Sequence, residues 1–206
     1  TDTRVIVRGK AGGEVEFGNT LLLAEQRDGV IVDWQLHRDS APADARQLVE
    51  SVARIETAYG VGTIRALGTD RGFCSAANQT LLQAKGIYDG ICPKHPGRLK
   101  ERMTEGQFVQ LQRRRSQTEG RIAIFKNGFL GRPLRAKGFA HRELAVTWQV
   151  LTHNLWVLAR LEQRPALALA GGAAMAALLP ASNAFAAASI NKGDTAWMLI
   201  ATALVV

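Results

Sequence analysis

Two acidic residues stand where a carboxylate can do chemistry. Asp70 lies within a Gly-Thr-Asp-Arg-Gly sequence directly after residues 63–67, where a predicted strand meets a glycine-containing turn. Glu119 lies on a predicted long helix, four residues after Arg115 and seven before Lys126, and these offsets return to nearly the same helix face. Taken singly, Asp70 can equally close the turn or cap the next helix. The Arg-Glu-Lys spacing can likewise be an ordinary ladder of ion pairs.

Together these residues fit phosphodiester chemistry that depends on two metal ions. Carboxylates hold two Mg²⁺ ions about 3.5–4 Å apart, so that one activates the attacking oxygen and the other stabilises the leaving oxygen. Mg²⁺, or Mn²⁺ in its place, needs few carboxylates because water and substrate phosphates complete its shell. We therefore predict that Asp70 and Glu119 are catalytic residues and metal ligands. Their carboxylates should then approach within about 4 to 8 Å.

Positive charge is concentrated in one part of the chain. The whole chain has 206 residues and a net charge of +8. Residues 94–142 contain thirteen Lys and Arg against three acids, whereas residues 1–93 sum to −2. Such a basic block favours a nucleic-acid surface, and the alternative is a pair of helices with a solvated basic face. We expect DNA-backbone contacts from Arg113, Arg114, Arg115, Arg121 and Lys126.

The order of predicted elements is that of an α/β protein. Residues 19–26 and 30–37 form a predicted hairpin around Asp28-Gly29. A helix should begin near Ser40 and end at Gly60, followed by a strand at 63–67, a helix at 75–85 and a strand at 87–92. The longest helical patterns cover residues 108–125 and 142–161. Alternation of strands and helices predicts a sheet with helices packed on it.

Several motifs in order resemble the DDE transposases of bacterial insertion sequences. Residues 68–73 with 75–78 are similar to the motif around the family's second aspartate. The spacing Arg115-x3-Glu119-x6-Lys126 is similar to the signature around its catalytic glutamate. The segments 8–18 and 153–155 also resemble the family. The resemblance implies an RNase H-like mixed sheet with flanking helices, Mg²⁺-dependent DNA cleavage and strand transfer, and DNA partners at transposon ends and target.

The sequence departs from the family pattern in two places. Gln112 stands where the signature has a tyrosine. The family's first aspartate lies on the first strand of the sheet, and we expect the chain to open after that strand, so the fold is incomplete at its N-terminus. We assign no first catalytic acid, although Asp2, Asp28, Asp33 and Asp39 are present. Whether the chain is an active enzyme is left open, and we expect no detectable strand transfer by it alone.

The last part of the chain reads differently from the rest. Residues 165–191 contain no charged side chain and are rich in alanine, and they include an Ala-x-Ala site at 184–186. Residues 189–205 resemble the start of bacterial ammonium transporters, with the preceding run as the signal peptide. We therefore divide the chain into a DDE domain at 1–163 and a tail at 164–206. The tail should be helical around 166–179 and 195–206 and should pack little against the domain.

Three functions remain in competition. The first is DNA transposition by a truncated DDE domain, the second a non-catalytic DNA-binding remnant, and the third a membrane-targeted fusion product in which the tail is functional. The first two imply a cytoplasmic, nucleoid-associated protein that can form a homo-oligomer, and the third a contact between the tail and the inner membrane. Two cysteines are too few for a disulfide framework, and the four histidines show no metal-ligand spacing.

Overall fold

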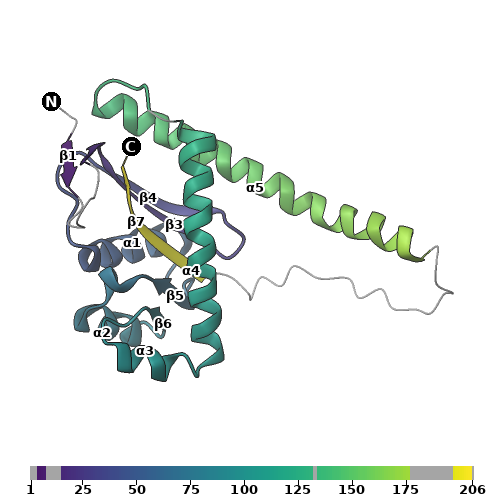
Figure 1. Cartoon of the computed structure of the whole chain (residues 1–206), viewed down its shortest axis with the longest axis horizontal. Coiled ribbons are helices and arrows are strands. Elements are labelled where there is room, and N and C mark those ends of the chain that lie inside the picture. Colours follow the sequence, from purple (N-terminus) through teal and green to yellow (C-terminus); the bar gives the residue numbers. More distant parts are fainter. Residues whose placement is uncertain (1–3, 8–14, 132–133, 177–196, 206) are drawn as a thin grey trace.

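The computed structural model describes residues 4–7, 15–131, 134–176 and 197–205, with side chains described over 18–131 and 134–162. Its centre is a five-stranded mixed sheet in the order β4-β3-β7-β5-β6 (Figure 1). Strands β3 (Thr20–Glu25) and β4 (Ile31–His37) are antiparallel, with Thr20 opposite His37. Strands β5 (Ala66–Thr69) and β6 (Tyr88–Ile91) are parallel. The hairpin and the α/β class expected from the sequence are confirmed.

The central strand of the sheet comes from the end of the chain. Strand β7 (Trp197–Val205) is antiparallel to β3 and parallel to β5. Its Ile200 pairs with both Ala24 and Thr69, so β7 fills the place between the hairpin and the parallel pair. A separate two-stranded sheet joins β1 (Arg4–Val7) to β2 (Val15–Gly18).

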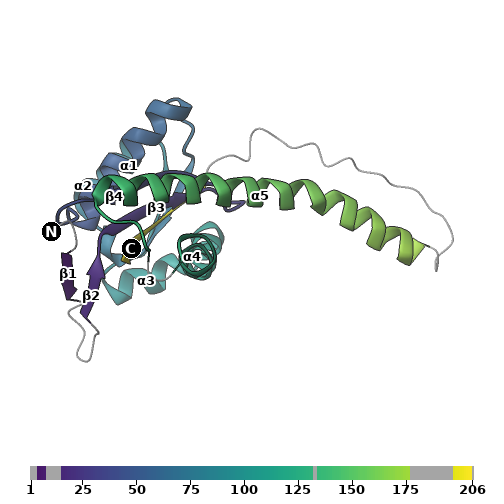
Figure 2. The ribbon, with the colours of Figure 1, turned by 90° about the horizontal axis from the view of Figure 1, so that it is seen from above.

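Helices cover both faces of this sheet (Figure 2). One core cluster joins Leu22 of β3 and Leu67 of β5 to α1 (Asp44–Tyr59) and α2 (Ala76–Ala84). The other joins Leu21 and Leu23 of β3 to the π-helical turn η2 (Phe125–Leu130) and to α5 (Phe139–Ala176). Leu21, Leu22 and Leu23 alternate between the two clusters because successive strand side chains point to opposite faces. The sheet is therefore buried on both sides.

Three further elements build the end of the sheet that carries Asp70. The short turn η1 (Arg71–Phe73) follows β5, and α3 (Pro96–Arg102) follows β6. Helix α4 (Gly106–Ile124) then packs across β5, β6 and β7. Ser75 caps α2 by accepting a hydrogen bond of 3.1 Å from the Asn78 amide, which explains why that helix begins where the sequence predicts.

Some expectations are wrong in detail. The N-cap of α1 is Ala43, without a side-chain bond, and not Ser40. The strand expected at 63–67 begins at Ala66 and runs to Thr69. The helix expected at 195–206 is instead β7, and its place in the sheet contradicts the expectation that the tail packs little against the domain. An apolar, partly β-branched run can form either structure, and here two unpaired strand edges select the strand. Helix α5 runs through residue 163, and the division of the chain there stays a prediction.

Candidate active site and nucleic-acid interface

Asp70 stands at the carboxyl end of β5 and is exposed. Its Oδ1 accepts a hydrogen bond of 2.8 Å from the Gly72 amide, so the carboxylate caps the turn η1. A side chain at Gly72 would collide with the Asp44 carboxylate and would crowd Asp70. Glycine in this motif therefore lets two carboxylates, one from β5 and one from the start of α1, approach the same turn. Asp44 was missed by sequence reasoning, since its distance along the chain from Asp70 gives no signal.

An open cavity of about 430 Å³ lies beside Asp70. Its lining comes from the end of β5, the end of β6, helix α3 and helix α4: Asp70, Arg71, Cys92, Leu99, Met103, Gln112 and Arg115. Gln112 donates a hydrogen bond of 2.8 Å to the Gly90 carbonyl and accepts one of 3.3 Å from Arg115 Nε. The residue at the signature's tyrosine position thus fixes α4 to β6 and orients Arg115.

Glu119 is linked to this cavity by its ion pair with Arg115, which lines the cavity. The two side chains form an ion pair of 3.1 Å, one helical turn apart, and the Glu119 side chain is 67% exposed. Glu119 is not among the residues that line the cavity. The structure therefore brings Asp70 and Arg115 to one cavity and pairs Glu119 with the same arginine, in the ion pair that the spacing allowed. The assignment of Asp70 and Glu119 as catalytic pair and metal ligands stays a prediction.

The three consecutive arginines of α4 point in different directions, because each residue of an α-helix is turned about 100° from the last. Arg113 is exposed and Arg115 lines the Asp70 cavity. Arg114 turns toward β3, where burial and the nearby Arg121 lower the pKa of its guanidinium. Its Nε and Nη2 atoms have no hydrogen-bond partner among the described residues.

Arg121 is held by a buried acid. Its Nη1 lies 3.0 Å from Glu25 Oε1, which also accepts a hydrogen bond of 2.8 Å from the Thr118 hydroxyl. Only 5% of the Glu25 surface is exposed. This contact fixes α4 to β3, so Arg121 supports the helix that carries Arg115 and Glu119. Lys126 lies just past the end of α4, in η2.

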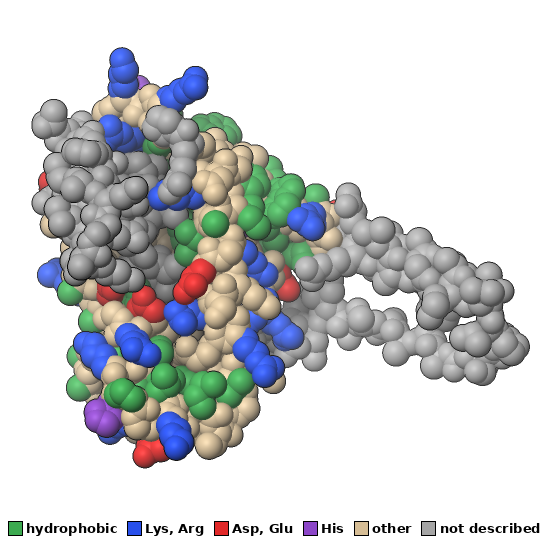
Figure 3. Space-filling model, in the orientation of Figure 1, with side chains coloured by type: hydrophobic (Ala, Val, Ile, Leu, Met, Phe, Trp, Pro, Cys, Tyr) green, Lys and Arg blue, Asp and Glu red, His purple; other side chains and the backbone are tan. Residues whose placement is uncertain are grey.

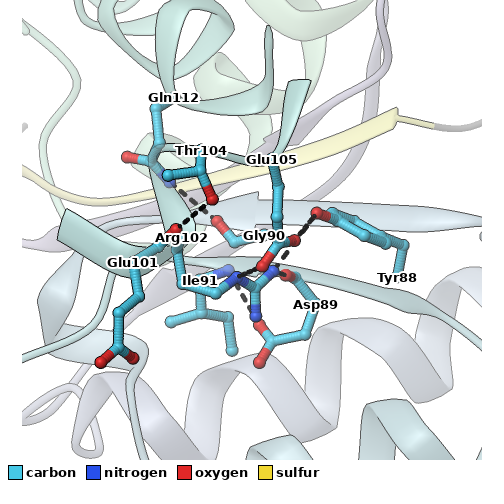
Figure 4. A network of polar contacts seen from close by, with 9 residues as sticks. All are labelled: Tyr88, Asp89, Gly90, Ile91, Glu101, Arg102, Thr104, Glu105 and Gln112. Carbon is cyan, nitrogen blue, oxygen red and sulfur yellow. Dashed lines mark hydrogen bonds and ion pairs between the residues drawn. The ribbon is translucent and has the colours of Figure 1, made fainter. Parts of the chain in front are cut away.

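A second cavity, of about 280 Å³, lies on the other side of α3. Its basic lining residues are Lys94, His95, Arg98 and Arg102. Arg102 is held in place: it donates to the Asp89 carbonyl, pairs with Glu105 at 2.9 Å and lies over the Tyr88 ring (Figure 4). The Tyr88 hydroxyl donates to Glu105, and burial, followed by that contact, raises the pKa of Tyr88. This network fixes the turn between α3 and α4 on β6 and leaves Lys94 and Arg98 exposed.

Positive side chains are thus gathered at one end of the sheet. Arg71 and Arg115 line one cavity, and Lys94 and Arg98 line the other. Figure 3 shows blue side chains over this end of the molecule and along α4. Among the described residues, no group of three or more His, Cys, Asp or Glu could hold a metal ion.

Comparison with known families settles the class of the protein. The sequence matches the transposase DDE domain family over residues 9–155, which is more than half of the chain. The chain belongs to this family. The match begins before β2 and ends within α5, so it includes both cavities and every candidate site residue.

Searches of curated proteins and of solved structures gave no match for this DDE domain. Within the described part of the chain, none of the helices combines the length and the apolar character that a membrane span requires. His153 and Asn154, which resemble the family at sequence level, have structural contacts here. His153 packs edge-on against Phe125 and Phe129, and Asn154 bonds the backbone of Ile31.

Proposed function

We propose that this chain acts in DNA transposition as the DDE domain of an insertion-sequence transposase, binding the DNA backbone across the basic end of its sheet. The observation that carries the proposal is the meeting of Asp70 and Arg115 in one open cavity, within the segment that matches the family. Arg71, Lys94 and Arg98 extend positive charge on both sides of α3. A polyanion that followed this surface would pass the Asp70 carboxylate.

The sheet supports the RNase H-like fold that the resemblance implies. The antiparallel hairpin, the parallel β5 and β6 and the site aspartate at the end of β5 agree with it. The expectation placed the family's first strand beside β5, and β7 occupies that place. Its sequence, residues 197–205, contains no acidic residue, and Ala201 follows the residue that pairs with Thr69 next to Asp70. The strand therefore completes the sheet without supplying a carboxylate.

The described residues do not by themselves make a complete Mg²⁺ site. Asp70 is exposed at the cavity, whereas Glu119 is paired with Arg115, and the described residues contain no group of three or more His, Cys, Asp or Glu that could hold a metal ion. We therefore derive no cleavage step for this chain. We expect weak Mg²⁺ or Mn²⁺ binding and no strand transfer by the chain alone. Isothermal titration with Mn²⁺ measures this: Asp70→Asn should remove the residual binding, and tight binding that survives the substitution would contradict the assignment.

DNA binding is tested by its dependence on salt. Each phosphate contact on duplex DNA contributes about 0.9 to the slope of log K against log salt concentration. Replacing Arg98 and Arg115 by alanine should therefore reduce the slope by about 2, measured by fluorescence anisotropy with a labelled duplex. The matched control replaces Arg27 and Arg65, which are exposed and line neither cavity. An unchanged slope in the first variant, or no binding at low salt, would contradict the proposed interface.

The other hypotheses make distinct predictions. A non-catalytic DNA-binding protein would show the same salt dependence but would stay inactive after an acidic residue is introduced on β7, the strand that pairs with β5. A cytoplasmic, nucleoid-associated location follows from a DNA partner. The likeness of residues 189–205 to an ammonium-transporter leader, and a membrane contact of the tail, stay predictions from sequence. Fractionation of cells that express the full chain distinguishes the two locations.

A further inference from the structure

Gln112 stands at the centre of a chain of hydrogen bonds that runs from β6 to the Asp70 cavity. Its side-chain amide donates a hydrogen bond of 2.8 Å to the Gly90 carbonyl (Figure 4). Its side-chain oxygen accepts one of 3.3 Å from Arg115 Nε, three residues further along α4. A glutamine can make both bonds at once because its amide carries a donor and an acceptor. We call Gly90, Gln112 and Arg115 the α4 relay.

Gly90 allows α4 to lie close enough to β6 for the first of these bonds. A side chain at Gly90 would collide with the Leu111 side chain and with the Leu67 carbonyl. Leu111 is fully buried, so it has no free space into which it could move. The close approach at Gly90 brings the next residue of the helix, Gln112, within hydrogen-bond distance of the Gly90 carbonyl. Backbone packing therefore determines where the Gln112 amide lies.

Arg115 is held at two of its three guanidinium nitrogens. Its Nε donates to Gln112, and its Nη1 donates a hydrogen bond of 3.1 Å to Glu119 Oε1. Its Nη2 makes no hydrogen bond to any residue that the structure describes, and Arg115 lines the Asp70 cavity. An arginine side chain that is already ordered loses less conformational entropy when it binds a phosphate oxygen. The relay therefore prepares Arg115 for an anion in this cavity.

Without Gln112, only the pair with Glu119 would hold the Arg115 side chain. The two side chains of that pair are 33% and 67% exposed, and exposed pairs within one helix order their side chains weakly. Arg115 would then sample several rotamers before it met a phosphate. The bond from Gln112 is the contact that connects Arg115 to the sheet, and through the sheet to Asp70 at the end of β5.

We propose that Gln112 is a positioning residue for DNA binding, which orders Arg115 for contact with a phosphate at the Asp70 cavity and acts only through Arg115. This role rests on the proposed function, because it concerns the same cavity and the same ligand. It is not carried over from the family, because Gln112 stands where the family signature has a tyrosine.

Fluorescence anisotropy with a labelled duplex tests the role through Gln112→Met, which keeps the side-chain length and removes both hydrogen bonds. DNA affinity at low salt should fall about two- to tenfold, the factor expected when one long side chain is no longer ordered before binding. In an Arg115→Ala background, Gln112→Met should cause no further loss, because the residue through which it acts is gone. Equal losses in the two backgrounds would overturn the proposal.

The matched control is Gln117→Met, on the same helix. Gln117 accepts a hydrogen bond of 2.8 Å from Arg114 Nη1 at the same spacing of three residues, and neither residue lines the two cavities described above. This variant should leave DNA affinity unchanged. A loss equal to that of Gln112→Met would show a general effect of changes in α4 and would also overturn the proposal.

Nuclear magnetic resonance of the wild type gives a measurement that needs no variant to fold. The Nε–H of Arg115 should exchange with water more slowly than the Nε–H of Arg113, which is exposed on the same helix. Equal exchange rates would contradict the ordering of Arg115. Wild-type protein without salt-dependent DNA binding would contradict the proposed function itself, whereas normal wild-type binding with an unaffected Gln112→Met variant would overturn only the role of Gln112.

Discussion

At the scale of single residues, the structure explains an acid that sequence alone could not place. Asp33 interrupts an apolar strand, yet its carboxylate is tied to α1 from two sides. It accepts 2.8 Å and 2.7 Å hydrogen bonds from the Arg54 guanidinium and one of 2.6 Å from the Ser51 hydroxyl. The side chain is only 8% exposed. Asp33 is therefore a structural residue that fixes α1 to β4, and its contacts do not favour a role as the family's first catalytic acid.

Replacing Asp33 by alanine should lower the free energy of unfolding by about 2 kcal/mol. Removing one partner of a buried ion pair typically lowers the free energy of unfolding by more than this. Here the Arg54 side chain is 36% exposed, so water can solvate its guanidinium and offset part of the change. Urea denaturation measures the change. The control is Glu50→Ala, which removes a surface pair with Arg46 and should cost less than about 0.5 kcal/mol. Equal effects of the two substitutions would contradict the structural role of Asp33.

Two buried histidines should make stability depend on pH. Burial lowers the pKa of His37 and His153 below the ordinary value of 6.5. The unfolded chain then binds more protons than the folded one, so stability is full above pH 6.5 and falls as the pH drops through the lowered folded values. Urea unfolding between about pH 5 and 7.5 measures this, with a slope of at most about 1.4 kcal/mol per pH unit for each group. His153→Gln should flatten the profile, and the exposed His141→Gln should not.

At the scale of elements, the side-chain amide of Asn154 anchors α5 to β4. The Asn154 side chain donates a hydrogen bond of 2.8 Å to the Ile31 carbonyl and accepts one of 2.8 Å from the Ile31 amide. It therefore satisfies both backbone polar groups of the first residue of an edge strand. The inner face of α5 packs on the same strand. The resemblance of residues 153–155 to the family therefore coincides with a contact that positions the last helix.

Asn154→Ala should have its largest effect locally, on the contact between α5 and the start of β4. The Ile31 amide loses its hydrogen-bond partner, so its hydrogen exchange should accelerate. The free energy of unfolding should fall by about 1–3 kcal/mol. Hydrogen exchange read at Ile31 is the decisive measurement. Thr152→Ala is the control, because the Thr152 hydroxyl only bonds the carbonyl of Trp148 within the same helix. Unchanged exchange at Ile31 in the Asn154 variant would refute the anchoring role.

At the scale of the whole molecule, the end of the chain completes the sheet. Strand β7 pairs with β3 on one side and β5 on the other, so its loss leaves two strand edges unpaired at the centre. A chain that stops at residue 176 should therefore aggregate or unfold at lower urea concentration than the full chain. Removing Val206 alone should have little effect. A truncated chain that stays monomeric with unchanged unfolding would show that β7 is dispensable.

Much of the local structure could be predicted from the sequence. The Asp28-Gly29 turn, where Gly29 has a φ of +92°, identifies the hairpin, and Ser75 marks the start of α2. Apolar spacing identifies α1, α4 and α5, and the basic block includes Lys94, Arg98 and Arg115, which line the two cavities. These features depend on neighbours in sequence, which backbone geometry and helical periodicity fix directly.

Only the tertiary structure decided what depends on contacts between distant residues. It showed that the apolar end of the chain forms a strand, because the unpaired edges of β3 and β5 bind it. It placed Asp44 beside Gly72, and it placed Arg115 in the cavity that Asp70 lines and in an ion pair with Glu119. It also showed that Arg113 is exposed to solvent, that Arg114 turns toward β3 and that Arg115 lines the Asp70 cavity. Residue types set which contacts are possible, but the packing of α4 across the sheet selects which of them form.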